Sequence, residues 1–319
     1  MKQKLIEVLS LQSESYNQFR VFSYIIRQLK KMGCSYYTFN GCIYATKGDA
    51  NNYPCIVSHM DTVHDIVENL TVVEVAGNLT GFNKFTMEQT GIGGDDKVGI
   101  FIALQCLENF DNIKAVFFRD EEVGCEGSYS PDIKFFEDCN FVLQCDRKGN
   151  KDFVTNASGI KLCGDDFKAD IKPILGKYGY KAANGMMTDV MALKEMGIKC
   201  SMANMSCGYY NPHSYNEYVN ILDVLNCLNM VIHIITKLKK KYVCKYSQPA
   251  KQRYNWNGIS KDNWKYEFED FKNFWNDDKI KEQIKEQNCE CCDEKAVLQY
   301  VSEYNIEMCD KCIRDYVRF

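Results

Sequence analysis

This sequence lacks long apolar runs, and no stretch approaches the length of about 18 apolar residues that a membrane-spanning helix needs. Residues 1–7 lack the uninterrupted apolar core of a signal peptide. A strong excess of either charge is also missing, because 39 Lys and Arg residues stand against 43 Asp and Glu residues, for a net charge of −4. This balance disfavours nucleic acid as the main partner. We therefore expect a cytoplasmic protein that is not attached to a membrane.

Histidine is scarce, with 4 residues, whereas cysteine is abundant, with 17. The cysteine number is odd, and most cysteines stand singly inside apolar stretches. They include Cys55, Cys106, Cys145, Cys200 and Cys227. Cysteines in such positions usually behave as small buried hydrophobic residues. This usage fits a reducing compartment, in which structural disulfides are rare.

The order of apolar patterns predicts a large α/β domain. Residues 3–33 carry apolar residues at helical spacing and predict one amphipathic opening helix. Beyond residue 36, short apolar runs alternate with helical patterns. The predicted strands are 41–46, 54–59, 113–119, 140–145 and 199–204, and the predicted helices are 96–109, 164–178, 188–196 and 218–241. Alternation of this kind predicts a three-layer α/β sandwich with a mixed, mostly parallel central sheet.

Composition divides the chain into three parts. Residues 1–243 hold the α/β pattern and form the predicted main domain. Residues 244–287 are polar and charged but contain all 3 tryptophans, Trp256, Trp264 and Trp275. A flexible linker would not carry so many aromatic residues, so we expect this connecting segment to pack on the main domain or on a partner. Residues 288–319 form a separate small module.

That module carries two Cys-x2-Cys pairs, Cys289 with Cys292 and Cys309 with Cys312, which 16 residues separate. The spacing is typical of a zinc ribbon or treble clef, in which four thiolates hold one structural zinc. A module this small needs the metal to fold. Disulfides or free thiols are the alternative, and a reducing compartment favours zinc. The module could dock a protein partner, contact nucleic acid or cap the main domain.

A candidate metal site begins at the end of the predicted strand 54–59. His59 and Asp61 lie two residues apart, so both side chains point to one face of the strand. His59 is then a metal ligand, and Asp61 accepts the second ring N–H, which fixes the tautomer. A chance His-x-Asp pair is the alternative for this motif alone.

Acidic residues follow at three further places. Asp95 comes after a glycine-rich turn and before a predicted helix, where its carboxylate could bridge two cations or simply cap the helix. Glu121 and Glu122 follow one predicted strand, and Asp146 follows another. One glutamate can bind metal while its neighbour acts as a general base toward water, although paired glutamates are also common on surfaces. Because ligands gather at the carboxyl ends of strands in open α/β sheets, we expect these acids to converge.

The second histidine ligand is predicted in Asn211-Pro212-His213, where a turn-forming Asn-Pro pair presents the imidazole on a loop. His233 is interpreted as a histidine on a helix face. His64 is close enough in sequence to contact the site or a substrate, but a plain structural role is favoured. Two histidines and at least three carboxylates are what a pair of divalent cations needs. The chain is therefore interpreted as a hydrolase built around two zinc ions.

Five motifs in this order resemble the co-catalytic di-zinc exopeptidases, the group that includes peptidase T, carboxypeptidase G-type enzymes and the zinc aminopeptidases. The motifs are S-H-M-D-T-V, G-G-D-D-K-V-G, D-E-E-V-G-C-E-G-S, C-D-R-K-G and G-Y-Y-N-P-H-S-Y-N-E-Y-V, and they span residues 58–219. Peptidase T and carboxypeptidase G-type members insert a lid or dimerisation domain between the last acidic ligand and the final histidine. Only 66 residues separate Asp146 from His213 here, and the sheet and its helices need them. We therefore expect this lid to be missing.

The resemblance implies two zinc ions, or cobalt or manganese in their place. The implied ligands are His59, Asp95 and Asp146 for one ion and Asp95, Glu122 and His213 for the other. Asp95 would thus bridge the two ions. Glu121 would deprotonate the bridging water, and Asp61 would orient His59. The group also tends to have a cis peptide after the bridging aspartate, here between Asp95 and Asp96.

We predict a zinc-dependent exopeptidase, most simply an aminopeptidase on short peptides, that hydrolyses an amide bond with a metal-bridging hydroxide activated by Glu121. Asp189 could hold the free amine, with a helix cap as its alternative role, and Tyr210 is a second candidate contact for substrate. One alternative is a related amidohydrolase or deacylase of small amides. Another is a non-catalytic metal-binding scaffold that acts through the C-terminal zinc module.

Overall fold

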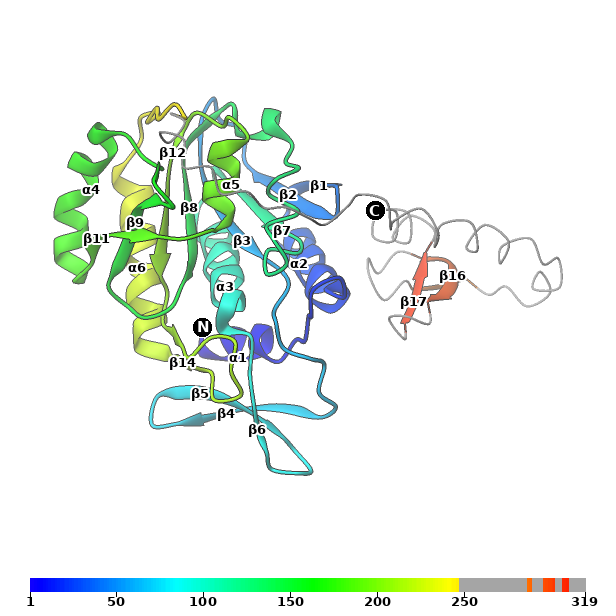
Figure 1. Ribbon diagram of the computed structural model, residues 1–319. Helices are drawn as coiled ribbons and strands as arrows, with labels where there is room; N and C mark the ends of the chain where they lie inside the picture. Colours follow the sequence, from blue (N-terminus) through cyan, green and yellow to red (C-terminus); the bar gives the residue numbers. More distant parts are fainter. Residues whose placement is uncertain (247–285, 289–294, 302–305, 310–319) are drawn as a thin grey trace, which may run out of the picture.

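The computed structural model describes residues 1–246, 286–288, 295–301 and 306–309. A nine-stranded β-sheet runs through the middle of residues 1–246 (Figure 1). Its strands are β1 (Ser35–Phe39), β2 (Cys42–Lys47), β3 (Tyr53–His59), β7 (Ile113–Phe118), β8 (Cys139–Arg147), β9 (Asp152–Ala157), β10 (Ile160–Lys161), β11 (Lys181–Gly185) and β12 (Ser201–Ser206). They lie in the order β1-β2-β7-β3-β8-β12-β9-β10, and β11 also pairs with β9.

The centre of this sheet is parallel. Strands β7, β3, β8 and β12 run in one direction, and β11 runs parallel to β9. Antiparallel pairs flank the centre, with β1 and β2 at one side and β9 and β10 at the other. The predicted α/β fold with a mixed central sheet is therefore confirmed.

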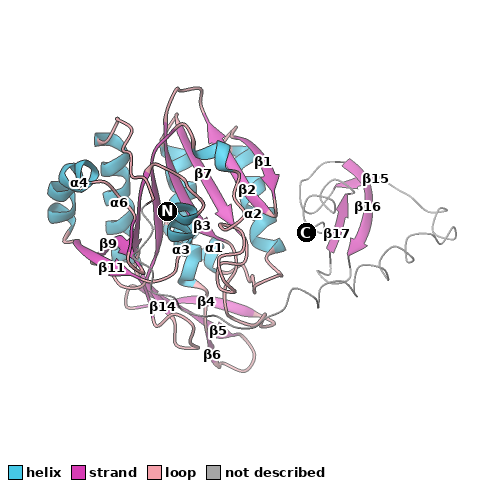
Figure 2. Ribbon diagram, turned by 45° about the horizontal axis from the view of Figure 1, so that its top comes forward, coloured by secondary structure: helices cyan, strands magenta, loops and turns pink. Residues whose placement is uncertain are grey.

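Helices cover both faces of the sheet (Figure 2), which gives the predicted three layers. They are α1 (Lys2–Leu9), α2 (Phe19–Lys31), α3 (Gly94–Asn109), α4 (Asp165–Tyr178), α5 (Asp189–Glu195), α6 (Ile221–Lys237) and a short 3-10 helix, η1 (Ile133–Phe136). Apolar side chains of α1–α4 and α6 pack with one face, which includes Ile56 and Phe117. Those of α5 and η1 pack with the other face, which includes Val57 and Val116. Neighbouring residues of one strand thus enter opposite cores, as the two-residue repeat of a strand dictates.

Helix α3 has the candidate ligand Asp95 near its start, and this end of the helix lies at the edge of the central sheet. Its residues from Val98 to Leu107 are all buried, and the helix packs on β3, β7 and β8. A helix that is apolar on every side is suited to such a position. The backbone at Asp95 and Asp96 is not helical, so the regular helix begins after them. Asp95 contacts His59, the last residue of β3, which places the start of α3 at the carboxyl end of that strand.

A second sheet, of five strands, lies below the main body in Figure 1 and was not predicted from the sequence. Its strands are β4 (Leu70–Val75), β5 (Asn78–Asn83), β6 (Gln89–Thr90), β13 (Tyr209–Tyr210) and β14 (Tyr218–Asn220). They lie in the order β13-β14-β5-β4, and β6 pairs with β5. The first three strands come from the interval between His59 and Asp95, and the last two flank His213. This sheet therefore joins two distant parts of the chain that both carry candidate ligands.

The interval between Asp146 and His213 holds no separate lid within the described residues. Residues 147–206 contribute β9–β12 together with α4 and α5, and the strands among them belong to the central sheet. The shorter segment that follows enters the second sheet as β13. The expectation that a lid is missing from this interval is therefore confirmed.

The predicted single helix over residues 3–33 is wrong. The chain forms α1 and α2, and residues 10–18 between them leave the helical path. Ser15 donates from its hydroxyl to the carboxylate of Asp61, and the carbonyl of Ser13 accepts the N–H of Thr62. Ser, Asn and Gln side chains offer the backbone alternatives to helical hydrogen bonds. Contacts with the candidate site therefore replace a helical turn here. The predicted helix 218–241 is too long, because Tyr218–Asn220 form strand β14 and helix α6 spans Ile221–Lys237. The other predicted helices and strands agree with the structure in type and position.

The C-terminal part contains three described strands, β15 (Glu286–Asn288), β16 (Lys295–Val301) and β17 (Ile306–Cys309), which form an antiparallel sheet. Cys289, Cys292 and Cys312 lie outside the described residues, as does most of the connecting segment 244–287. The site of four cysteines and the domain boundaries stay predictions.

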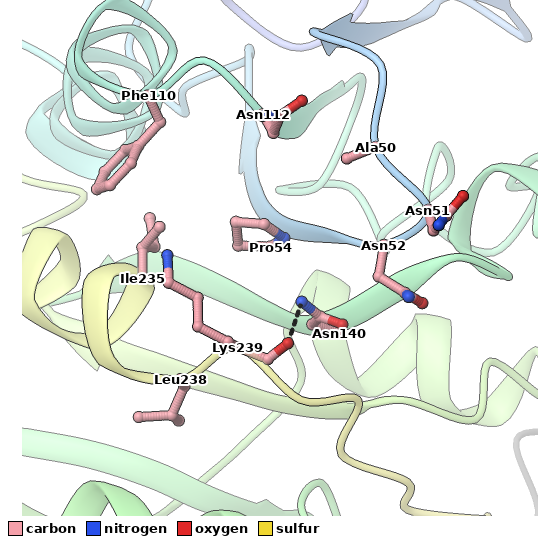
Figure 3. A pocket seen from close by; sticks show the side chains of 10 residues that line it. All are labelled: Ala50, Asn51, Asn52, Pro54, Phe110, Asn112, Asn140, Ile235, Leu238 and Lys239. Atoms are coloured by element: carbon pink, nitrogen blue, oxygen red, sulfur yellow. Dashed lines mark hydrogen bonds between the residues drawn. The ribbon is translucent and has the colours of Figure 1, made fainter.

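An open hollow of about 290 Å³ lies at the amino ends of β3 and β8 (Figure 3). Pro54 of β3 and Asn140 of β8 line it, together with Phe110 and Lys239. The amide of Asn140 donates to the carbonyl of Lys239 at 3.3 Å. Since His59 ends β3, this hollow and the candidate ligands lie at opposite ends of the sheet.

No helix in the described part of the chain is both long and apolar enough to cross a membrane.

Lys194 of α5 is fully buried, and its ammonium group donates to three backbone carbonyls. The Nζ–O distances are 3.1 Å to Ile198, 2.6 Å to Cys200 and 2.8 Å to Cys244. Burial lowers the pKa of Lys194. These three bonds compensate the ammonium group for the loss of water, and they fix the backbone at Cys244 to the main domain.

We expect Lys194→Met to lower the free energy of unfolding by about 3 kcal/mol, because buried carbonyls lose charged donors. Denaturant unfolding of the full chain measures this loss. Lys172→Met removes an exposed lysine from α4 and serves as control, with an expected change within about 0.5 kcal/mol. Equal stability of the two variants would contradict the role given to Lys194.

Candidate metal centre

The predicted ligands of the main sheet converge at one edge. His59 ends β3, Asp146 lies at the end of β8, and Glu121 and Glu122 occupy the loop after β7. These three strands are parallel neighbours, so their carboxyl ends meet at the same edge. The start of α3 brings Asp95 to this edge. The convergence expected from the sequence is therefore found.

Asp95 lies between the two histidines. His59 Nε2 is 3.3 Å from Asp95 Oδ1 and 3.6 Å from Asp146 Oδ1. His213 Nε2 is 3.3 Å from Asp95 Oδ2 and 3.1 Å from Glu122 Oε1. Each oxygen of Asp95 thus faces a different imidazole. The structure brings all five predicted ligands together, in two groups that share Asp95.

Asp96 also lies in this cluster and was not among the predicted ligands. In the described part of the chain, two groups of three residues have potential ligand atoms within 4.8 Å of one another: His59 with Asp95 and Glu122, and His59 with Asp96 and Asp146. The oxygens of Asp96, however, accept the backbone N–H groups of His59 at 3.2 Å and Gly99 at 3.0 Å. Asp96 is therefore better suited to hold the backbone than to bind an ion. The peptide bond between Asp95 and Asp96 is cis, as predicted.

Asp61 connects His59 with the loop of the two glutamates. His59 Nδ1 lies 2.9 Å from the carbonyl oxygen of Asp61 and 3.3 Å from its carboxylate. The same carboxylate accepts the backbone N–H groups of Glu121 at 2.9 Å and Glu122 at 3.2 Å, and the hydroxyl of Ser15 at 2.8 Å. Burial opposes the charge of Asp61, but its contacts with His59 and these donors lower its pKa. Asp61 thus contacts Nδ1 of His59 twice, and its carbonyl oxygen lies nearer than its carboxylate.

The two adjacent glutamates have different surroundings. Glu122 contacts His213, whereas Glu121 accepts a hydrogen bond from the thiol of Cys125, with an Sγ–Oε1 distance of 3.4 Å. Burial raises the pKa of Glu121 well above its usual value, and the charge of Asp146 acts in the same direction. A raised pKa makes a carboxyl group hold a proton more readily, and perturbed pKa values of this kind are frequent among groups that transfer protons.

The donor set fits divalent cations. Hydrogen bonds to Asp95 and Glu122 raise the pKa of His213 to about 10. Burial and the charge of Asp95 raise the pKa of Asp146 to about 8. Protons are thus held tightly among imidazoles and carboxylates that are packed closely together, and a cation can take their place. Imidazole nitrogen and carboxylate oxygen are preferred ligands of zinc, and they also suit cobalt and manganese.

Several contacts around Asp146 were not predicted. Its carboxylate accepts the amide of Gln144 at 3.1 Å and the hydroxyl of Thr188 at 3.3 Å. Asn204 bonds the backbone of Asp146 on both sides, with its Oδ1 2.9 Å from the N–H and its Nδ2 2.7 Å from the carbonyl oxygen. The alternation of buried strands could have placed Gln144 on the face of Asp146, since the two residues are two apart. Thr188 and Asn204 come from other elements and carry no such signal.

The two predicted substrate contacts lie in different places. Asp189 is fully buried at the start of α5, where its carboxylate accepts the amide of Gln144 at 3.0 Å, and burial raises its pKa to about 6. Tyr210 lies in the second sheet, where its ring stacks on Tyr218 and its hydroxyl donates to Asp223 at 2.6 Å. Asp189 is thus connected to the cluster of candidate ligands through the amide of Gln144, whereas the hydroxyl of Tyr210 is bonded to Asp223.

No protein-family model matches this sequence, and no curated protein matches it. Solved structures do. They include the aminopeptidase PepT from Bacillus cereus, at 13% identity with a TM-score of 0.62, covering 74% of this chain and 97% of that one. A tripeptidase from Staphylococcus aureus is 14% identical, with a TM-score of 0.59 and coverage of 73% and 96%. An aminopeptidase from Desulfurococcus kamchatkensis is also 14% identical, with a TM-score of 0.59 and coverage of 75% and 96%.

The fold is shared with aminopeptidases. At these identities the likeness concerns the fold, and the chemistry of this chain has to be argued from its own residues.

We expect zinc to raise the unfolding temperature of the full chain by about 5 °C or more at a zinc concentration of 100 times Kd, since binding then adds about 2.7 kcal/mol. Asp95→Asn should lose most of this shift, because Asp95 faces both histidines. Thermal unfolding with zinc and with a chelator measures the shift. Asp152→Asn, which alters the ion pair with Arg147, serves as control. An undiminished shift in Asp95→Asn would contradict a shared ligand.

Proposed function

We propose that this protein is a metal-dependent aminopeptidase that acts on short peptides. The observation that supports this most strongly is the combination of a shared carboxylate, Asp95, between two histidines with a separate, partly buried carboxyl group, Glu121, beside them. A purely structural metal site has no use for Glu121. The fold shared with aminopeptidases and a tripeptidase supports the same class of reaction.

In this proposal the site holds two zinc ions. The ligands would be His59, Asp95 and Asp146 for one ion and Asp95, Glu122 and His213 for the other. When bound, such ions polarise the scissile carbonyl group and lower the pKa of the attacking water. Asp61 keeps the ring of His59 in place, and its bonds to the N–H groups of Glu121 and Glu122 fix the loop that carries both glutamates.

Glu121 would move the proton in this reaction. As general base it accepts a proton from water at its carboxylate, and as general acid it returns this proton to the amine that leaves. Burial raises the pKa of Glu121, which supports the second step, because the carboxyl group then holds the proton more readily until it is passed to the amine. The thiol of Cys125 holds one oxygen of Glu121 by a hydrogen bond.

The charges around the cluster favour a substrate with a free amine. Asp189 adds a buried acidic group behind Asp146. Arg147, at the end of β8, pairs with Asp152 at 2.9 Å, and Arg119 pairs with Glu126 at 2.8 Å. Neither arginine is thus presented to the terminal carboxylate of a peptide. Asp189 is not among the proposed ligands, so its acidic group would stay available beside the bound ions, which supports binding of an ammonium group and cleavage from the amino end.

We expect Glu121→Gln to lower kcat on amino-acid amides and short peptides by a factor of about 10² to 10⁴, because the proton acceptor is lost. Metal content, measured on the same sample, should stay at the level of the wild type. Glu126→Gln alters a carboxylate of the same loop that pairs with Arg119, and should retain activity. Loss of metal together with activity would count against Glu121 as general base.

The substrate class is tested in the same assay with a panel of amino-acid amides, short peptides and N-acyl amino acids. Cleavage of substrates with a free amine supports an aminopeptidase. Cleavage of N-acyl amino acids alone would establish the rival amidohydrolase or deacylase. Tight binding of two ions without any hydrolysis would favour a scaffold.

The C-terminal module is proposed to hold a third, structural zinc through Cys289, Cys292, Cys309 and Cys312. We expect elemental analysis to find about three zinc ions in the full chain and two in residues 1–246. The shortened chain ends after Cys244, because its carbonyl accepts Lys194. One zinc in the full chain and none in the shortened chain would mean that the main domain binds no metal.

A further inference from the structure

We propose that Glu217 is a positioning residue that holds the loop of His213 in register with Asp95, an inference that rests on the two-ion site proposed above. Glu217 follows His213 by four residues and is fully buried. It lies in the last of the five motifs, G-Y-Y-N-P-H-S-Y-N-E-Y-V. No ion ligand of the proposed sets contacts its carboxylate through a side chain, so its effect would pass through the backbone.

The carboxylate of Glu217 accepts hydrogen bonds from backbone N–H groups of Asp95 and of the turn that precedes it. Oε2 accepts the N–H of Ile92 at 3.1 Å and that of Gly93 at 2.7 Å, and Oε1 accepts the N–H of Asp95 itself at 3.2 Å. One side chain from the loop of His213 thus fixes the backbone of the shared ligand. Charged acceptors form stronger hydrogen bonds than neutral ones, and burial strengthens them further.

His64 completes the surroundings of Glu217. Its Nε2 lies 2.8 Å from Glu217 Oε2, and its ring lies against the backbone of Gly91, where a Cβ atom would overlap it. The structural role favoured for His64 from the sequence would thus consist of these two contacts, with Glu217 and with the backbone of Gly91. The ring of His64 contacts the carboxylate of Glu217, which in turn holds the glycine turn.

The glycines of the turn make this arrangement possible. Gly93 has a φ of 59°, and a Cβ atom there would lie 2.5 Å from Thr62 Cγ2. A Cβ atom on Gly94 would lie 2.8 Å from Val219 Cγ2 and 3.2 Å from Glu217 Oε1. The backbone can wrap closely around the carboxylate only because these side chains are missing. Buried Lys97 closes the turn from the other side by donating to the carbonyl of Ile92 at 2.9 Å.

The two imidazoles are held in different ways, which is why one ion should depend on Glu217 more than the other. His59 belongs to a central strand and is fixed by Asp61 and by the bond from its N–H to Asp96. His213 lies on the loop between β13 and β14, in the second sheet. Glu217 is the contact through which that loop reaches the backbone of Asp95. Its loss should therefore weaken the ion at Asp95, Glu122 and His213.

Glu217→Gln is the sharpest test, because the side chain keeps its size and reach. A glutamine offers one carbonyl oxygen and one NH₂ group, so the NH₂ group must face a backbone N–H that now lacks an acceptor. Glu108→Gln is the matched control, because this carboxylate lies near the far end of α3 and pairs with Lys4 on the surface. Calorimetric titration of zinc into metal-free full-length protein gives the affinity of each ion.

We expect three zinc ions to bind to the wild type and to Glu108→Gln, two at the site of Asp95 and one in the C-terminal module. In Glu217→Gln the ion at His59, Asp95 and Asp146 and the ion of the C-terminal module should stay within about threefold of the wild type. The second ion of the site, at Asp95, Glu122 and His213, should weaken by tenfold or more. Excess zinc should then restore hydrolysis. Unchanged affinities for both ions, or an equal loss for both, would overturn the proposal, since a merely structural role lowers stability without selecting one ion. A wild type that binds fewer than two ions in addition to that of the C-terminal module would overturn it as well.

His64→Ala keeps the proposal testable if Glu217→Gln does not fold, because His64 is partly exposed and its removal leaves Glu217 in place. The second ion of the site should then weaken by more than threefold, and a second affinity within threefold of the wild type would count against the role of Glu217. The titration contains no peptide, so it is independent of the reaction. Selective weakening without any peptide cleavage would reject the proposed function alone, whereas cleavage with unaltered zinc binding would reject the role of Glu217 alone.

Discussion

The carboxylate of Asp95 lies between two histidines that belong to different sheets, and much of the structure serves to hold it there. His59 ends a strand of the main sheet, and His213 lies between two strands of the second. Carboxylates buried close together cost free energy unless donors or positive charges surround them. Three neighbouring carboxylates, those of Asp61, Asp96 and Glu217, are each bonded by at least two backbone N–H groups. The backbone thus supplies much of the electrostatic support of the site.

The parts of the site that could be predicted are those where a regular pattern ends in a chemically distinctive residue. His59 and Asp146 each close an apolar strand, and parallel strands bring their ends together. Ser15 and Glu217 could not be found in this way, because each is one polar residue in a polar stretch and acts on a distant segment. The second sheet was missed for a related reason. Its strands are short or half-exposed, so neither an apolar run nor a clear alternation marks them.

The likeness to solved aminopeptidases at 13–14% identity shows how little of the sequence the fold requires. Cores tolerate many exchanges of apolar residues if volume and pattern are kept. At the carboxyl edge of the sheet the demands are stricter, since a ligand, its orienting acceptor and a tight glycine turn each need one kind of residue. In this chain, few positions therefore determine the proposed chemistry, whereas many positions together determine the fold.

The strand pairing in the second sheet affects how this protein folds during translation. Strand β5 pairs with β14, and the register joins Thr80 with Tyr218. During translation, the interval between these residues corresponds to on the order of 10 s of synthesis. For that time β4 and β5 expose an unpaired edge, of the kind that invites aggregation. His59, Asp95 and Asp146 leave the ribosome first, so the growing chain would carry half of the proposed metal site before the loop of His213 completes it.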